Sequence, residues 1–284
     1  MIPVSPGHEI PGKIFYALTA HGNGLAVENV LCFQQISDIS EGKDGRSMSE
    51  KKWFERLEKI DTPTITNVVA SYPKQTDNCL GLYDPWSVNW YTDERMRCMY
   101  PELGARAGYA VTCIYGPTDG DFGRLGFADV LRAIHESPKP VVVCIKQDFP
   151  EEIKRKNGLC GGNMMTAMKA LGAVGVISDG PSRDIDEIRP MEMQYLLTGV
   201  APGHGAFSVK AVNVPVSLCG MDVAPGEIIH MDENGACKFP ASKAEKVCEL
   251  GEKLLEIEKK RQEKMRQSSD PEKIIRIMTG FEDD

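Results

Sequence analysis

Apolar runs rich in β-branched residues alternate with amphipathic stretches from residue 105 onward. The segments ARAGYAVTCIY, KPVVVCIK and VGVIS predict strands, and the continuous apolar run in KPVVVCIK predicts a strand buried on both faces. The segments FADVLRAIHES and GGNMMTAMKALGA, which alternate with these strands, predict helices. Strands separated by helices predict an α/β fold, in which helices pack on a sheet with parallel strands.

Residues 207–240 have a different pattern. Four short segments, FSVKAV, VPVSLCG, EIIHMDE and ACKF, have the composition of strands and are separated by turns rich in glycine and proline. Because no helical stretch connects them, we expect antiparallel pairing and a barrel-like section.

A C-terminal helix is predicted after residue 241, where Ser242 and Glu245 have the spacing of a capping box. The apolar residues that follow are spaced by 3, 4 and 3 positions, which predicts one apolar stripe on an amphipathic helix that ends near Gln267. They are Val247, Leu250, Leu254 and Ile257. The tail SSDPEKIIRIMTGFEDD predicts a further short helix.

The first hundred residues contain two predicted helices. Ser47 and Glu50 have capping-box spacing before WFERLEKI, and a second helix is predicted to begin at Thr62-Pro63. Residues 72–103 are predicted to be mostly loop. We therefore divide the chain into an N-terminal extension (1–46), a main domain (47–240), and a C-terminal helix and tail (241–284).

Charge and apolar composition exclude several classes of protein. The chain has 41 acidic and 33 basic residues and a net charge of −8, so we expect no nucleic-acid binding. No run approaches the roughly 18 apolar residues that cross a membrane, and the N-terminus lacks a signal pattern. The nine cysteines show no CxxC spacing, so we interpret them as reduced thiols of a cytoplasmic protein.

The richest candidate chemistry lies in residues 158–184, GLCGGNMMTAMKALGAVGVISDGPSRD. The two loops of this segment follow predicted strands, and the carboxyl edge of a parallel sheet is where ligands bind. Gly161 and Gly162 allow a ligand to approach the backbone, and the free N–H groups of Asn163 and Met164 attract an anion. A tight turn without ligand is the alternative for such a glycine pair.

The second loop adds Arg183 and Asp184. The planar guanidinium of Arg183 suits a carboxylate, and the carboxylate of Asp184 suits Mg²⁺. Together they predict a site for a small 2-oxo acid beside a metal, whereas a solvated surface pair is the alternative interpretation. From these residues alone, both remain open.

The string GGNMMTAMKALGAVGVISDGPSRD resembles the signature of the RraA-like family, which includes 4-hydroxy-4-methyl-2-oxoglutarate aldolase and oxaloacetate-decarboxylating relatives. The similarity continues through LTGVAPGHG and VNVPVSLCGMDVAPGEIIHMDENGACKFP, and upstream through RLEKIDTPTITNVV and GARAGYAVTCIYGPTDG. It covers roughly residues 50–265. Residues 1–46 and the loop around Trp86 have no recognised counterpart in the family.

The resemblance implies an α/β/α sandwich of the swivelling phosphohistidine-domain type, with active sites in clefts between the subunits of a homotrimer or homohexamer. It implies that Arg183 binds the substrate carboxylate and that Asp184 holds Mg²⁺ or Mn²⁺. The backbone at Gly161 and Gly162 and the amides of Asn163 and Met164 would complete the carboxylate site.

Two further positions depend on the resemblance. A glutamate on the C-terminal helix of a neighbouring subunit reaches the metal through water in the aldolases; Glu258 is our candidate for it, with Glu256 as the rival. Family aldolases usually have Asp or Glu directly after the first glycine of the helix-opening motif, where this chain has Gly162. The sequence thus keeps the metal and carboxylate elements and lacks one acidic group that handles protons.

We therefore expect a divalent-metal-dependent lyase that cleaves a C–C bond of a small anionic 2-oxo acid. Retro-aldol cleavage and oxaloacetate-type decarboxylation would both proceed through a metal-stabilised enolate. One alternative is another enzyme on the same scaffold, such as a hydratase, isomerase or hydrolase of a sugar-derived acid. The other is a non-catalytic interaction protein, as in the ribonuclease-regulator branch of the family.

Other polar residues have a structural interpretation that we favour over the chemical one. His204 is interpreted as a surface turn residue rather than as a substitute acid-base group. Asp186 and Glu187 are interpreted as a solvated helix face or a cap. A Schiff-base role for Lys146 is the less favoured alternative, because the metal signature offers another electron sink.

Overall fold

The computed structural model describes residues 52–72, 78–87, 89–118 and 124–279, all of which belong to one compact unit, Asp44–Asp284. The predicted extension (1–46) and the predicted cap formed by Ser47 and Glu50 lie outside the described residues. No helix in the described part of the chain is long and apolar enough to span a membrane. The described cysteines are free thiols, and most are buried.

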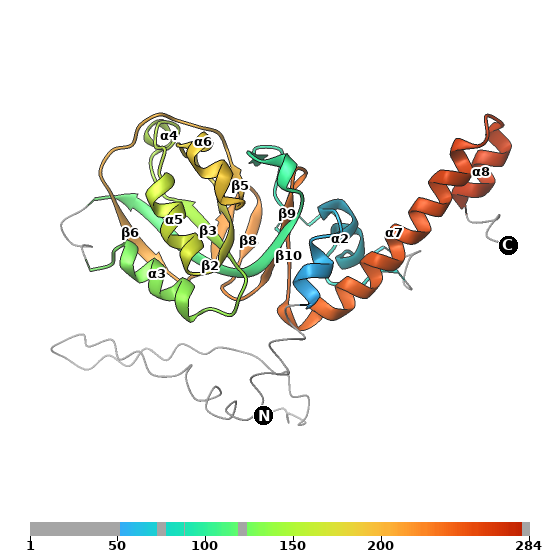
Figure 1. Ribbon diagram of the computed structural model, residues 1–284, viewed down its shortest axis with the longest axis horizontal. Helices are drawn as coiled ribbons and strands as arrows, with labels where there is room; N and C mark the ends of the chain where they lie inside the picture. The colour runs from blue at the N-terminus through green and yellow to red at the C-terminus, as the bar shows by residue number, and fades with distance from the viewer. Residues whose placement is uncertain (1–51, 73–77, 88, 119–123, 280–284) are drawn as a thin grey trace, which may run out of the picture. The chain divides into compact units, whose positions relative to one another are not determined.

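Four parallel strands form the centre of the main sheet (Figure 1). Strand β2 pairs with β3, β3 with β4, and β4 with β5, each in parallel register. Their bounds are Arg106–Pro117 (β2), Val141–Gln147 (β3), Ala173–Ser178 (β4) and Gln194–Leu197 (β5). The three strands predicted after residue 105 are confirmed, and β5 is additional. A two-residue strand, β1 (Arg97–Cys98), pairs antiparallel with β5 at the sheet edge.

The remaining strands are antiparallel. Strand β2 pairs on its other side with β9 and β6, and β9 continues into β10. Strands β7 and β8 form a separate two-stranded hairpin. The bounds are Phe207–Val212 (β6), Val216–Leu218 (β7), Met221–Val223 (β8), Ile228–Asp232 (β9) and Gly235–Phe239 (β10). The predicted antiparallel, barrel-like section is therefore confirmed.

The two faces of the central sheet are covered by different elements. Helices α3 (Phe127–Glu136), α5 (Gly162–Ala170) and α6 (Ile185–Ile188) pack on one face (Figure 1). The other face of the same strands packs against the β7–β8 hairpin. Both faces of β3 are buried, as its apolar run predicted. This is a mixed α/β fold whose sheet curls toward a barrel, and over the central strands a hairpin covers the face opposite the helices.

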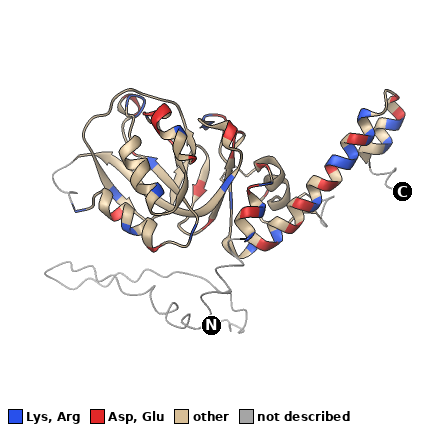
Figure 2. Ribbon diagram, viewed as in Figure 1, with Lys and Arg blue, Asp and Glu red and all other residues tan. Residues whose placement is uncertain are grey.

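The helices at the two ends of the chain pack on the β9–β10 end of the sheet. They comprise residues 52–57, α2 (Thr62–Val69) and the first part of α7 (Ala244–Arg266). Helix α8 (Pro271–Thr279) contacts α7. Short helices connect other elements: α4 (Glu151–Lys154), η1 (Pro101–Leu103) and η2 (Arg189–Met191). Charged residues follow α7 along its length (Figure 2).

The start of α7 differs from the prediction. Ser242 does not cap this helix; a 3₁₀ turn, η3 (Ala241–Lys243), leads into it, and Lys243 is the N-cap residue without a side-chain hydrogen bond. The capping-box prediction with Glu245 was wrong because the 3₁₀ turn places Ser242 before the cap position.

Beneath α2, His230 on β9 is fully buried. Its Nε2 donates to the Leu57 carbonyl at 3.0 Å, and in the neutral ring this leaves Nδ1 to accept from the Thr62 hydroxyl at 2.9 Å. Burial lowers the pKa of His230 below its usual range, although the carboxylates of Asp232 and Asp61 act in the opposite direction. The folded protein therefore resists protonation of a group that the unfolded chain protonates freely.

Acidification is expected to destabilise the fold through His230. The unfolded residue titrates near pH 6.5, so this contribution is complete above about pH 6.5 and is lost as the pH falls toward the lowered folded pKa. The slope approaches about 1.4 kcal/mol per pH unit within that window. Urea unfolding between pH 7.5 and 5.5 measures it, and His230→Gln should flatten the slope. The matched control is His135→Gln at an exposed position; an equal slope in all three proteins would contradict the assignment.

Candidate active site

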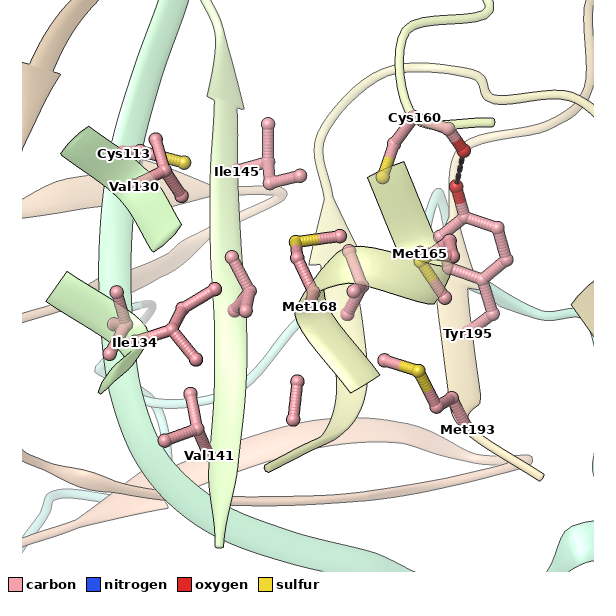
Figure 3. Close-up of a cluster of buried hydrophobic side chains, with 14 of the residues drawn as sticks. Cys113, Val130, Ile134, Val141, Ile145, Cys160, Met165, Met168, Met193 and Tyr195 are labelled. Atoms are coloured by element: carbon pink, nitrogen blue, oxygen red, sulfur yellow. Dashed lines mark hydrogen bonds between the residues drawn. The ribbon is translucent and has the colours of Figure 1, made fainter. Parts of the chain in front are cut away.

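Two loops at the carboxyl edge of the parallel strands are tied together. The loop after β4 accepts a backbone bond from Leu159 at Pro181, and the Ser182 hydroxyl bonds the Cys160 carbonyl and the Tyr195 hydroxyl. Figure 3 shows the Cys160 carbonyl bonded to Tyr195 beside the buried side chains that hold α5 on the sheet. These bonds bring the start of α5 against the end of the β4 loop, as we expected for two loops that follow parallel strands.

Arg183 and Asp184 meet the two glycines at the start of α5. The Asp184 Oδ2 atom accepts a hydrogen bond from the Gly162 amide at 3.0 Å and lies 3.4 Å from the Arg183 Nε. About a third of each of the two side chains is exposed. The structure thus brings together four of the predicted site residues: Gly161, Gly162, Arg183 and Asp184.

The backbone of Asp184 has a left-handed conformation, with φ 60° and ψ 35°. Non-glycine residues adopt this region rarely, although aspartate tolerates it better than most. This conformation accompanies the bond to the Gly162 amide, which orients one carboxylate oxygen. The other oxygen, Oδ1, accepts no hydrogen bond from the described residues, so it is available to a cation.

Gly161 has backbone dihedral angles that any residue could adopt. A glycine is required here because there is no room for a side chain. A Cβ at this position would lie 2.3 Å from the Asp184 Oδ2 and 2.9 Å from the Arg183 Nε. Any side chain here would therefore displace both functional groups. The signal for this constraint, a glycine pair opening a helix, is visible in the sequence.

The polar atoms of this site suit an anion and a cation. The buried Arg183 Nε makes no hydrogen bond with the described residues, although it lies 3.4 Å from the Asp184 Oδ2, and a buried donor without a hydrogen bond is costly. Asn163 and Met164 lie in the first turn of α5, where N–H groups have no acceptor within the helix. A cavity of about 420 Å³ is lined by Arg183, Asp184, Ile185 and the Val200–Pro202 segment; Asn163 and Met164 are not among its lining residues.

The donor set fits Mg²⁺ or Mn²⁺ held by few protein ligands. No group of three or more His, Cys, Asp or Glu side chains that could enclose a metal occurs within the described ranges. Mg²⁺ is usually bound through one or two carboxylates, with water and substrate oxygens completing its shell. The carboxylate of Asp184, with Oδ1 unpaired, matches that requirement.

A second, cationic cavity of about 520 Å³ lies at the same sheet edge and shares Val200 with the first. Its lining includes five basic side chains and two acidic ones: Arg95, Arg97, Lys146, Lys154 and Arg155, with Glu151 and Asp179. The buried Asp179 carboxylate accepts from Lys146 and Lys154 at 2.6 Å each. This excess of positive charge on an acidic protein favours anionic ligands near the site. Lys146 is thus engaged in an ion pair, which does not favour the Schiff-base alternative.

Glu258 and Glu256 do not reach this site within the same chain. Glu258 lines a separate cavity with Tyr72 and Arg261, and Glu256 forms an exposed ion pair with Lys260. Helix α7 lies at the opposite end of the fold from α5 and α6 (Figure 1). A role for either glutamate therefore requires a neighbouring subunit, as the resemblance implies, and stays a prediction.

His204 is exposed, and its Nδ1 lies 3.0 Å from the Gly205 carbonyl, as expected for a surface turn.

Glu187, interpreted from the sequence as part of a solvated helix face or a cap, is exposed, but it also makes a contact that the sequence did not predict. Its carboxylate lies over Gly162, where a Cβ would be 2.2 Å from Oε1. No local signal predicts this contact, because it depends on how α6 packs against α5.

A family model described as RraA-like, Aldolase/RraA, matches residues 82–237, which include all of the elements that form this site. The chain belongs to the RraA-like family. The expectation drawn from the 158–184 segment is thereby confirmed.

Two curated relatives are informative about the RraA-like match. An uncharacterized protein of Methanocaldococcus jannaschii is 27% identical over 127 residues, 44% of this chain and 61% of the relative. The 4-hydroxy-4-methyl-2-oxoglutarate aldolase of Thermus thermophilus is 31% identical over 86 residues, 30% of this chain and 52% of the relative. The matched region thus spans only about half to three fifths of these relatives.

Among solved structures, Streptomyces coelicolor RraAS2 is described as an unusual member of the RNase ES inhibitor RraA protein family. It superposes with a TM-score of 0.57 at 19% identity, covering 74% of this chain and 96% of that one. At this identity the similarity shows the RraA-like fold alone.

Proposed function

We propose that this protein is a divalent-metal-dependent lyase that cleaves a carbon–carbon bond of a small 2-oxo acid, by retro-aldol cleavage, oxaloacetate-type decarboxylation, or both. The supporting observation is the convergence of Arg183 and Asp184 on the start of α5. Within the described residues, the Arg183 Nε has no hydrogen-bond acceptor and the Asp184 Oδ1 has no hydrogen-bond donor. The aldolase name of the Thermus thermophilus relative agrees in reaction class.

Each residue has a separate role in this proposal. Arg183 binds the substrate carboxylate through its guanidinium, and the amides of Asn163 and Met164 complete the carboxylate site. Asp184 holds Mg²⁺ or Mn²⁺. The bound cation supplies a Lewis acid that draws electron density toward the 2-oxo group. Cleavage passes the electrons of the C–C bond to the 2-oxo-acid fragment, and both reactions share this step.

We also propose the assembly and setting that the resemblance implies. The main domain (47–240) would be a variant of the α/β/α sandwich of the swivelling phosphohistidine-domain type, flanked by the extension (1–46) and the C-terminal amphipathic helix and tail (241–284). It would assemble as a cytoplasmic homotrimer or homohexamer, in which Glu258 of a neighbouring subunit approaches the cation through water. The partner is a small anionic substrate rather than a nucleic acid or a membrane.

Removing the metal is expected to abolish the activity. The full-length protein would be assayed for pyruvate release from 4-hydroxy-4-methyl-2-oxoglutarate and oxaloacetate with Mg²⁺ or Mn²⁺, then after treatment with EDTA and after restoring the metal. We expect release that is lost with EDTA and regained with either ion. Pyruvate release that persists unchanged in EDTA would contradict the metal-dependent mechanism.

The same assay separates the alternatives. Turnover of sugar-derived acids without pyruvate would support a hydratase, isomerase or hydrolase on this scaffold. No turnover, together with no binding of Mg²⁺ or oxalate by calorimetry, would support a non-catalytic interaction protein. The name of the Streptomyces coelicolor neighbour is the observation that keeps this last alternative in view.

A further inference from the structure

The carboxylate of Glu187 occupies the space above Gly162. A Cβ at Gly162 would lie 2.2 Å from the Glu187 Oε1 and 2.4 Å from its Cδ, so no side chain could start at residue 162 without displacing this group. Helices α5 and α6 lie side by side (Figure 1). The glycine at the start of α5 therefore makes room for an acidic group that comes from another helix.

The position of α6 is fixed by contacts away from the site. The Tyr100 hydroxyl donates to the Ile185 carbonyl at 2.6 Å, and the Arg189 guanidinium lies 4.9 Å from the centre of the Tyr100 ring. Arg189 also pairs with Glu102. Because both ends of the short helix are anchored, the fold sets where Glu187 projects.

Glu187 has no partner that explains its placement. Its carboxylate makes no hydrogen bond or ion pair with any residue in the described ranges. It lies against Gly162, while the Asp184 carboxylate bonds the amide of that same glycine. Both carboxylates therefore lie at the start of α5, and one or two carboxylates are the protein ligands that usually bind Mg²⁺.

We propose that Glu187 is the second acidic group of the divalent-cation site, supplied by α6 in the space that Gly162 leaves open. Asp184 binds the cation, and Glu187 adds a second negative charge and further oxygen donors beside it. This inference rests on the proposed function and goes beyond it by naming a residue. It also accounts for Gly162 at the position where family aldolases usually have Asp or Glu, because in this chain α6 would supply the acidic group.

The neighbouring acid on the same helix provides a matched control. Asp186 is exposed like Glu187 and lies one residue away, but its side chain is not among the nearest atoms that a Cβ at Gly161 or Gly162 would meet. If any acid near α6 strengthened cation binding through its charge alone, both residues would matter equally. The structure instead assigns the role to Glu187.

Titration calorimetry of the full-length protein with Mn²⁺ measures the effect without catalysis. Glu187→Gln is expected to weaken Mn²⁺ binding by about 10- to 100-fold, the range found when groups that support metal ligands are removed. Asp186→Asn is expected to bind like the unaltered protein. Asp184→Asn is expected to lose binding, while keeping an oxygen that can accept from the Gly162 amide.

A carboxylate transfer tests the position of the charge. Glu187→Ala empties the space above Gly162, and adding Gly162→Asp returns a carboxylate to it. The double variant should bind Mn²⁺ more tightly than Glu187→Ala alone. Thermal unfolding of each variant checks that the fold is retained.

The outcomes separate this inference from the proposed function. Unchanged Mn²⁺ binding in Glu187→Gln beside lost binding in Asp184→Asn would overturn the role of Glu187 alone. A double variant no better than Glu187→Ala would also overturn it. Absence of Mn²⁺ binding in the unaltered protein, or equal binding in Asp184→Asn, would instead overturn the proposed metal site.

Discussion

Asp184→Asn and Arg183→Ala are each expected to lower kcat/KM for pyruvate release by about 10²- to 10³-fold, the cost of removing one preorganised electrostatic group. Asparagine retains an acceptor for the Gly162 amide and removes the charge, so the start of α5 should stay intact while cation binding is lost. Alanine at position 183 removes the guanidinium whose Nε has no hydrogen-bond acceptor among the described residues. Steady-state assays on purified variants measure both losses.

Two further variants test whether these losses come from the guanidinium and from the position of the arginine. Arg183→Lys keeps the positive charge but not the planar fork, so it should recover only part of the activity. Arg132→Ala removes an exposed arginine that pairs with Asp129 on α3 and does not line the cavity beside Arg183, so it should leave kcat/KM unchanged. Near-normal pyruvate release by Asp184→Asn would count decisively against a cation held by this residue.

Asp179→Ala is expected to lower the free energy of unfolding by about 3 kcal/mol, because it leaves charged groups without their buried partner. The Asp179 side chain is 4% exposed and accepts from Lys146, Lys154 and the Gln147 amide. Its removal places two ammonium groups next to each other. For a protein of this size, the expected fall in melting temperature is roughly 6–12 °C. Calorimetric or circular-dichroism melts measure it.

The control for Asp179 is an acid of the same charge on the surface. Glu256 pairs with Lys260 on α7 with about two thirds of both side chains exposed, and solvent screens such pairs. Glu256→Ala should leave the melting temperature unchanged. Asp179→Asn, which keeps an acceptor for the Gln147 amide, should fall between the two. Equal melting temperatures for Asp179→Ala and Glu256→Ala would show that the buried ion pairs contribute nothing to stability.

Local patterns predicted the elements of this fold well. Three elements were predicted from patterns that act over a few residues. They are β3 with both faces buried, helix α5, and helix α2 beginning at Thr62-Pro63. The cap of α7 was mispredicted because the spacing of two residues says nothing about how the preceding strand joins the helix. Ser242 has the right spacing to Glu245, but a 3₁₀ turn joining β10 to the helix moved the cap to Lys243. Connections between elements obey packing as well as local preference.

The sequence by itself determined which residues lie in the two loops of the site. Gly161 and Gly162 end the first loop, and Arg183 and Asp184 end the second. Because both loops follow parallel strands, the sheet brings them to one edge. Only the tertiary structure decided that Glu187 lies over Gly162, that Asp179 is shared by two lysines, and that a hairpin covers the second face of the sheet. Sequence spacing fixes which residues follow a strand. Contacts between residues 25 to 33 positions apart depend on the angle at which separate elements pack, and no local pattern encodes that angle.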